Sequence, residues 1–326
     1  MDYVKFGHTG LEVSPLCLGA MGFGDPKSGF HEWVLEETES REVIKKALDL
    51  GINFFDTANI YSYGASEEIL GKALNDFAPR DEIVVATKLY SKMKKAPNSG
   101  GLSRKAIFFE IEQSLERLQM DYVDLYIIHR WDYTTPIEET MEALHDLVKT
   151  GKVRYIGASA MYAWQFAKAQ AVADKHGWTK FVSMQNHLNL LYREEEREML
   201  PLCDDQKMAV TPYSPLAAGR LTRDWDAQTK RFATDKTAQS KYDQTKEQDQ
   251  LIVRRVAEIA ETRQVKRAQV ALAWLLQKES VVAPIIGATK ESHLLDALPA
   301  IELKLSTEEV AYLEEPYLPH AVVGAN

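Results

Sequence analysis

Four side chains that can carry or move a proton lie at or just beyond the ends of apolar segments. Asp56 ends the segment FFD, Lys88 ends EIVVATK, His129 ends YVDLYIIH, and Tyr61 follows Asp56 in FFDTANIY. Taken singly, each has an ordinary structural explanation: a helix cap, a charge at a strand end, a histidine at the edge of the core, or a packed aromatic ring. Taken together they indicate a site, because neighbouring strands lie only about 4.8 Å apart and parallel strands end at one edge of a sheet.

A tyrosine, a lysine and a histidine in one place suggest a proton donor for a carbonyl oxygen. A free tyrosine has a pKa of about 10, which is too high for ready proton release at neutral pH. An ammonium favours the phenolate, so we expect Lys88 to lower the pKa of Tyr61, while Asp56 holds Lys88 without meeting Tyr61 directly. His129 would donate a hydrogen bond to the same carbonyl oxygen. Protonation there is useful when a hydride reaches the carbon, which predicts a nicotinamide nearby.

Eight short segments rich in β-forming residues alternate with longer amphipathic segments. The β-rich segments are 16–19, 52–56, 82–88, 122–129, 153–159, 181–185, 209–214 and 281–287. Several are apolar almost throughout, as expected for parallel strands covered on both faces. Helical periodicity occurs at 39–50, 103–118, 136–150, 164–176, 192–206, 248–263 and 266–277, and again after Ser292. This alternation predicts an α/β protein with a (β/α)8 TIM barrel, as a single domain over residues 1–326.

Three further segments lie outside the alternating pattern. YVKFGHTGLEVS (3–14) predicts an N-terminal β-hairpin that plugs the bottom of the barrel, and residues 306–313 predict an extra C-terminal helix. The polar residues 222–250 predict a long surface loop. A doubly wound open sheet is the alternative fold, but it would require G-x-G-x-x-G after the first strand, and GAMGFG at 19–24 has the wrong spacing.

Composition narrows the class of protein. A net charge of -9 argues against nucleic acid or an anionic membrane as the main partner. The two cysteines, Cys17 and Cys203, form no metal-binding or redox motif, and the histidines show no H-x-x-x-H pairing, so no metal is expected. The N-terminus has no signal-peptide pattern, and no apolar run reaches the roughly 18 residues of a membrane span. We therefore expect a cytoplasmic protein that acts on a small molecule.

The later strand ends carry residue types that suit a nicotinamide cofactor. Tyr213 can stack on a flat ring, and Ser159 and Gln185 can hold a carboxamide. In SPLAAGRL, Arg220 and the nearby backbone amides can meet a pyrophosphate. In PIIGATKESHLL, the residues suited to a phosphate at the start of a helix are Gly287, Thr289 and Lys290. A Gly-x-Thr turn at a strand end is also common without any ligand.

These motifs together resemble those of the aldo-keto reductases along the whole chain. FFDTANIY resembles the strand-two signature of that family, and VVATK, DLYIIHR, YIGAS, SMQNHLNLL, TPYSPLAAGRL and PIIGATK resemble its later motifs. HRWD after the fourth strand is similar to the bacterial branch of the family. The resemblance implies NADPH-dependent reduction of aldehydes or ketones, with Tyr61 as proton donor assisted by Lys88, Asp56 and His129. It also implies cofactor contacts from Met21, Gly22, Ser159, Gln185, Tyr213, Ser214, Leu216, Arg220, Gly287, Thr289, Lys290 and His293.

The sequence departs from the family pattern at three cofactor positions. Ala160 stands where many members have asparagine, His293 where many have arginine near the adenosine 2′-phosphate, and Ala297 where asparagine is usual. These departures weaken a strict preference for NADPH over NADH, although Lys290 can still pair with the phosphate. The substrate pocket is expected from loop residues, chiefly Trp33, Tyr90, Arg130 and Trp131, with Phe30, His31 and Tyr162 as further candidates.

Two other functional classes compete with a working reductase. A cofactor-binding regulatory subunit with weak or no turnover would keep the barrel, but the presence of all four proton-handling residues favours an enzyme. A lyase or isomerase barrel without nicotinamide would not need Tyr213 or residues 284–290. A monomer or weak homo-oligomer is expected.

Overall fold

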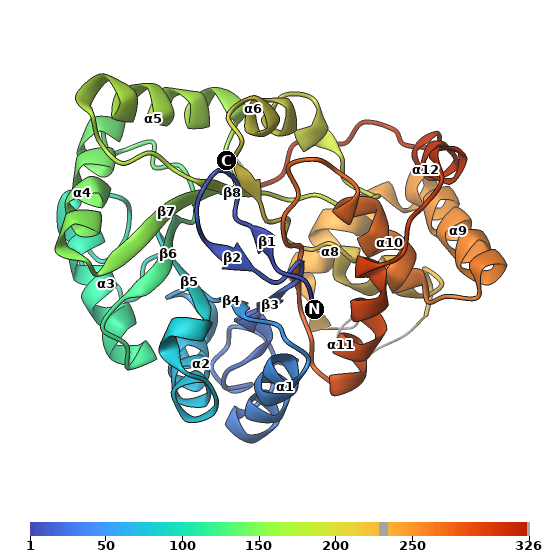
Figure 1. The fold of residues 1–326 in the computed structure, drawn as a ribbon, viewed down its shortest axis with the longest axis horizontal. Helices are drawn as coiled ribbons and strands as arrows, with labels where there is room; N and C mark the ends of the chain where they lie inside the picture. Colours follow the sequence, from blue (N-terminus) through green and yellow to red (C-terminus); the bar gives the residue numbers. More distant parts are fainter. Residues whose placement is uncertain (228–233, 325–326) are drawn as a thin grey trace.

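Eight parallel strands form the central sheet of the computed structural model, which describes residues 1–227 and 234–324. The strand order is β10-β3-β4-β5-β6-β7-β8-β9, so the chain passes around the sheet in sequence and the last strand pairs with the first. Figure 1 shows the helices arranged around the outside of these strands. The strands are β3 (Cys17–Gly19), β4 (Phe54–Asp56), β5 (Val84–Leu89), β6 (Val123–Ile128), β7 (Val153–Ser159), β8 (Ser183–Gln185), β9 (Ala209–Val210) and β10 (Ile285–Ile286).

The sheet closes between β9 and β10 through a few backbone contacts. Val210 forms a parallel bridge with Val281, and the amide of Ile285 donates to Pro212 O at 2.9 Å. Pro212 and Pro284 have no N–H to donate, which shortens the regular ladder in this region. The predicted (β/α)8 barrel is confirmed, with each predicted strand present and several of them shorter than their apolar segments.

The described helices follow most of the predicted amphipathic segments. None of them, within residues 1–227 and 234–324, is long and apolar enough to cross a membrane. Ser306 caps the predicted C-terminal helix, since its hydroxyl accepts a hydrogen bond from the amide of Glu309. The helices are α1 (Glu37–Asp49), α2 (Ala65–Phe77), α3 (Arg104–Leu118), α4 (Ile137–Thr150), α5 (Ala163–His176), α6 (Met199–Asp205), α8 (Lys236–Tyr242), α9 (Lys246–Arg263), α10 (Arg267–Leu276), α11 (Glu291–Ala297) and α12 (Thr307–Glu314).

Helix α2 was not predicted, and its tertiary contacts explain it. Its buried face includes Ile69, Leu70 and Leu74, which have helical spacing. Gly71 in its centre lowers the intrinsic helix propensity. A Cβ atom at this position would lie 2.2 Å from Leu118 O, so glycine is required for the close approach of α2 to the end of α3.

Two segments differ from their predictions. The helix expected at 192–206 is interrupted, with a 3-10 turn at Glu194–Glu196 and then the short α6. The surface loop expected at 222–250 contains α8 and the first turns of α9, and Tyr242 and Asp249 are buried there. Residues 228–233 of that segment lie outside the described residues.

The N-terminal hairpin closes one end of the barrel. Strands β1 (Val4–Lys5) and β2 (Glu12–Val13) pair antiparallel, and Figure 1 shows them across the middle of the ring of helices. Phe6 packs edge-on against Phe54 of β4, with ring centroids 5.6 Å apart. Phe6 and Val13 join the first residues of the strands in an apolar cluster inside the barrel. The open carboxyl-terminal end is therefore the one available for a site, as in other barrels of this kind.

Candidate active site

Asp56, Lys88, Tyr61 and His129 come together at the carboxyl-terminal end of the barrel. Lys88 Nζ lies 2.5 Å from Asp56 Oδ1 and 3.3 Å from the hydroxyl of Tyr61. The imidazole of His129 packs edge-to-face against the ring of Tyr61, with centroids 5.9 Å apart and an interplanar angle of 82°. The predicted convergence of these four side chains is therefore present in the structure.

Lys88 is the hub of this cluster. It has no exposed surface, and its ammonium donates to Thr57 O at 2.7 Å as well as to Asp56 and Tyr61. Asp56 uses its other carboxylate oxygen to accept a hydrogen bond from Gln185 Nε2 at 2.9 Å. Because a buried charge is costly unless it is paired and hydrogen-bonded, these contacts are what allow the ion pair to remain inside the barrel. The connection from Asp56 to Tyr61 runs through Lys88, as predicted.

The protonation states favour a neutral phenol beside a charged lysine. Burial raises the pKa of Tyr61 above its ordinary value, while the nearby Lys88 ammonium pulls it down. The sequence-based expectation of a lowered Tyr61 pKa is thus reversed, because the loss of hydration outweighs the ammonium. Burial opposes the charge on Lys88, but Asp56 and Tyr61 outweigh it and raise the pKa of this ammonium. Burial, Lys88 and Arg130 all lower the pKa of His129 well below its ordinary value, so this imidazole is neutral at neutral pH.

The segment Thr57–Tyr61 brings the phenol back over the strand ends. The amide of Thr57 donates to Ala86 O at 2.9 Å, and the amide of Asn59 donates to Lys88 O at 3.1 Å, so the chain continues alongside β5. The side chain of Asn59 donates to Glu110 of α3 at 2.9 Å. A 3-10 turn then begins at Tyr61. The segment between Asp56 and Tyr61 is therefore held by hydrogen bonds to β5 and α3.

The HRWD residues after His129 have distinct structural contacts. Arg130 donates to Gly324 O, which holds the C-terminal tail over this edge of the barrel. Trp131 is nearly buried and packs against the ring of Trp164, with centroids 6.0 Å apart. Arg130 and Trp131 were predicted to line the substrate pocket, and the structure shows them engaged with the tail and with α5. A substrate that binds Arg130 would share this guanidinium with Gly324 O.

Asp132 anchors two loops at the carboxyl-terminal end of the barrel. Its carboxylate accepts hydrogen bonds from the amides of Leu102 at 2.8 Å and Thr134 at 2.9 Å, and from the hydroxyls of Thr134 and Thr135. Burial works to raise the pKa of Asp132, but these hydrogen bonds outweigh it and hold the pKa below its ordinary value. The aspartate of HRWD thus joins the loop after β5 to the loop after β6.

Replacing Asp132 by alanine is expected to lower the free energy of unfolding by about 2–4 kcal/mol, because buried donors lose a charged acceptor. Since the folded pKa is depressed, this stabilisation is present above the unfolded pKa and is lost as pH falls through the folded value. Denaturant titrations at pH 7 and near pH 3 would measure both effects. An equal loss for Asp132→Ala at the two pH values would contradict this account.

The predicted aromatic pocket residues have different contacts in the structure. Phe30 lies 6.1 Å from Tyr61 between ring centroids, and it belongs to the wider set of candidates. Trp33 lies beside Gly22 instead: a Cβ atom on Gly22 would lie 3.3 Å from the indole of Trp33. Tyr90 is half-buried, and its carbonyl oxygen accepts from the amide of Gly101 at 2.7 Å. Among Phe30, Trp33 and Tyr90, Phe30 has a described ring contact with Tyr61.

The residues predicted for the carboxamide and the ring lie on β7, β8 and the segment after β9. Ser159 and Gln185 are register partners on neighbouring strands, and both are buried. Because the Gln185 amide nitrogen is engaged with Asp56, its side-chain oxygen is the atom it can offer to a carboxamide. Tyr213 stacks on His187 with centroids 5.2 Å apart, and Lys241 Nζ lies 4.9 Å from the centroid of the Tyr213 ring. Lys241 was not predicted at this site, because it lies in the polar segment 222–250, which was predicted to be a surface loop.

Arg220 is placed differently from its predicted role at a pyrophosphate. It is only 3% exposed, pairs with Asp243, and lies between the rings of Trp225 and Tyr242. A phosphate that binds this guanidinium would compete with the carboxylate of Asp243. Ser214 and Leu216 are half-buried at the start of the same segment, and Ser214 O accepts from Asn189 Nδ2 at 2.9 Å.

The remaining predicted cofactor residues gather where β3 and β10 end. A Cβ atom on Gly22 would lie 3.6 Å from Thr289, which joins the half-buried Met21 and its neighbour Gly22 to the segment after β10. Gly287 is exposed with open space around it, and Lys290 is exposed. His293 is also exposed, and its Nδ1 accepts from the amide of Thr289 at 3.3 Å. An open glycine beside a threonine and an exposed ammonium fits the phosphate-bearing end of a nicotinamide dinucleotide.

Comparison with known proteins shows which family the chain belongs to. The model of the Aldo/keto reductase family matches residues 15–317. The chain belongs to this family. It is 44% identical to aldo-keto reductase AMT2 of Alternaria alternata, with 97% of this chain and 91% of the relative aligned. It is 43% identical to versiconal hemiacetal acetate reductase of Aspergillus parasiticus, with 99% of this chain and 98% of the relative aligned.

A third relative comes from Schizosaccharomyces pombe and is named for aryl-alcohol dehydrogenase activity. It is 44% identical, with 99% of this chain and 97% of the relative aligned. Membership of the aldo/keto reductase family supports oxidoreductase chemistry on carbonyl groups. These three relatives are fungal. The resemblance of HRWD to a bacterial branch stays a prediction.

Proposed function

We propose that this aldo/keto reductase family member reduces aldehydes or ketones to alcohols with NADPH, and that Tyr61 is the general acid. The observation that carries the proposal is the contact of the buried Lys88 ammonium with both Asp56 and the Tyr61 hydroxyl, beside a neutral His129. Such an arrangement can hold a carbonyl oxygen and give it a proton.

The chain's own residues divide the work as follows. Tyr61 stays protonated at neutral pH because burial raises its pKa, so its proton is available when charge develops on the substrate oxygen. Lys88 lies against the phenol oxygen and stabilises the phenolate left after transfer, while Asp56 keeps Lys88 in place. His129 would donate an N–H to the same carbonyl oxygen and orient it. When bound, NADPH supplies the hydride that reduces the carbonyl carbon.

The cofactor is proposed to lie across the ends of β7, β8, β9, β10 and β3. Ser159 and Gln185 would hold the carboxamide, and Tyr213 would stack on the ring. Lys290 and Thr289 would bind the adenosine 2′-phosphate, with His293 beside them. Ala160 and Ala297 in place of the family's usual asparagines imply fewer polar contacts than in many members. We therefore propose a preference for NADPH that depends mainly on Lys290.

Aromatic aldehydes are the proposed first substrate class. Phe30 offers a flat apolar wall beside Tyr61, and one relative is named for aryl-alcohol dehydrogenase activity. We also propose that the protein works in the cytoplasm as a monomer or weak homo-oligomer. Its two cysteines are free and buried, which suits a reducing compartment.

A pH profile of NADPH consumption with benzaldehyde derivatives tests this function. With a raised Tyr61 pKa and a lowered His129 pKa, kcat/KM for reduction is expected to be level from about pH 6 to 9 and to fall above the ordinary tyrosine value of about 10. Oxidation of the alcohol should instead rise with pH, because it requires the phenolate.

The same assay separates the competing possibilities. NADH in place of NADPH, and Lys290→Gln with each, would measure the proposed cofactor preference. NADPH binding without turnover of any aldehyde would favour a regulatory subunit. A reduction rate that climbs through pH 7 to 10 would rule out Tyr61 as the acid.

A further inference from the structure

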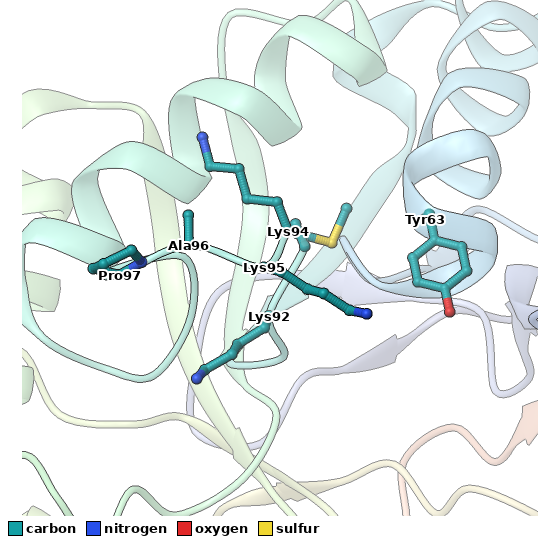
Figure 2. Close-up of a pocket in the computed structure, with 7 residues that line it drawn as sticks. Tyr63, Lys92, Lys94, Lys95, Ala96 and Pro97 are labelled. Carbon is teal, nitrogen blue, oxygen red and sulfur yellow. The ribbon is translucent and has the colours of Figure 1, made fainter.

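An open pocket borders the candidate active site on the side of the loop after β5. It has a volume of about 720 Å³ and lies between Tyr63 and the segment Lys92–Pro97. Figure 2 shows Lys95 extending toward Tyr63, whereas Lys92 and Lys94 point away from it. The residues that line the pocket are Tyr63, Lys92, Met93, Lys94, Lys95, Ala96 and Pro97.

Phe30 packs against both Tyr61 and Tyr63, and Tyr63 lines the pocket. The ring centroid of Phe30 lies 6.1 Å from that of Tyr61 and 6.2 Å from that of Tyr63. Lys88 belongs to β5, and the lysine loop continues from the end of this strand. A substrate held with its carbonyl oxygen at Tyr61 can therefore extend past Phe30 toward Lys95.

Hydrogen bonds fix the backbone of the loop that carries the lysines. Ser99 is nearly buried, and its hydroxyl lies 2.6 Å from Lys94 O and 2.7 Å from Ala96 O. The amide of Met93 donates to Ser99 O at 3.2 Å. The amide of Leu102, where the loop ends, donates to Asp132. The segment is thus a folded loop that presents its lysines at a defined place on the edge of the barrel.

The charged residues that line this pocket are all lysines. Within residues 1–227 and 234–324, no carboxylate pairs with Lys92 or Lys95. Lys94 instead lies over the ring of Phe109, with Nζ 5.2 Å from its centroid. The protein as a whole carries a net charge of -9, so two unpaired ammonium groups beside the site form a local exception. Such an exception attracts anions from solution and raises their local concentration.

We propose that Lys95, with the hydroxyl of Tyr63, binds an anionic group at the far end of the carbonyl substrate. The group is a carboxylate or a phosphate, since both accept hydrogen bonds from ammonium and phenol groups. Arg130 is less suited to this role because it donates to Gly324 O. The proposal rests on the proposed reductase function and names the substrate class of the same site.

Matched substrate pairs test the proposal. The pairs are 4-carboxybenzaldehyde with its methyl ester, and glyceraldehyde 3-phosphate with glyceraldehyde. For the wild-type protein, kcat/KM is expected to be about three-fold to five-fold higher for the anion of at least one pair, and added salt should reduce this ratio. The pair with the larger ratio identifies the anion as a carboxylate or a phosphate.

Variants assign the effect to particular lysines. Lys95→Gln should lower kcat/KM for the anion about three-fold to five-fold and leave the neutral partner within about two-fold. Lys95→Glu should reverse the preference. Lys92→Gln and Lys94→Gln are the matched controls, because each removes the same charge from a side chain that points away from Tyr63, and each should keep the wild-type ratio.

A binding measurement separates this inference from the reductase function. Isothermal titration calorimetry with benzene-1,4-dicarboxylate and with inorganic phosphate needs no turnover, so it reports on the pocket even if no aldehyde is reduced. At least one of the two anions should bind about three-fold to five-fold more weakly to Lys95→Gln than to the wild type. Equal substrate ratios in the wild type and Lys95→Gln, or anion binding that is unchanged in Lys95→Gln, would overturn the proposal.

Discussion

Tyr61→Phe is expected to lower kcat for aldehyde reduction by roughly 10²–10⁴-fold while NADPH binds with wild-type affinity. The variant keeps the ring that packs against His129 and Phe30 and removes only the hydroxyl that contacts Lys88. The loss would therefore fall on proton transfer. Stopped-flow absorbance would measure the rate, and calorimetric titration with NADPH would measure affinity.

The control for this variant is Tyr312→Phe. Tyr312 lies on α12 and bonds to Glu258, so it loses the same hydroxyl in a different part of the molecule. It should retain wild-type kcat. Turnover by Tyr61→Phe at the wild-type rate would show that another group, or water, supplies the proton.

Asp56→Ala is expected to lower the free energy of unfolding by about 3–5 kcal/mol, because it leaves a buried ammonium without its carboxylate. Lys88 is wholly buried, and Thr57 O and Tyr61 OH are uncharged acceptors that cannot neutralise it. Gln185 would also lose its acceptor. Guanidinium denaturation followed by circular dichroism would measure the loss.

A second substitution distinguishes the charge effect from simple truncation. Asp56→Ala/Lys88→Met removes both charges and should recover part of the lost stability, since a buried pair can be replaced by apolar groups at little cost. Glu12→Ala removes one partner of the exposed Lys5–Glu12 pair and should cost less than about 1 kcal/mol. A double variant less stable than Asp56→Ala alone would contradict the buried-charge explanation.

The same ion pair has a definite pH dependence. Because Asp56 and Tyr61 raise the folded pKa of Lys88, its stabilising contribution is fully present below the unfolded lysine value of about 10.4. It is lost as pH rises through the folded pKa. The stability difference between wild type and Asp56→Ala should therefore remain constant at neutral pH and shrink only in strongly alkaline solution.

Sequence periodicity was sufficient to predict the barrel and to predict that its proton-handling residues converge. A strand buried on both faces must be apolar along its length, so the eight strands are visible as short β-rich runs. Parallel strands joined by helices must end on one side, which places Asp56, Lys88 and His129 together without knowledge of any contact. Helix α2 was not predicted, because Gly71 lowers the helix propensity of this segment. Only the close approach of α2 to Leu118 explains why glycine is present there.

Tertiary structure decided the properties that depend on burial and on distant partners. The direction of the Tyr61 pKa shift could not be predicted from the presence of Lys88, because the opposing loss of hydration depends on packing. The sequence predicted that Arg220 binds a phosphate, whereas in the folded protein Arg220 pairs with Asp243. Asp132 and the lysine loop owe their roles to hydrogen bonds between segments far apart in the chain. Residue type and order determine which groups reach the end of the barrel, whereas their charge states and free surfaces depend on the neighbours that folding brings to them.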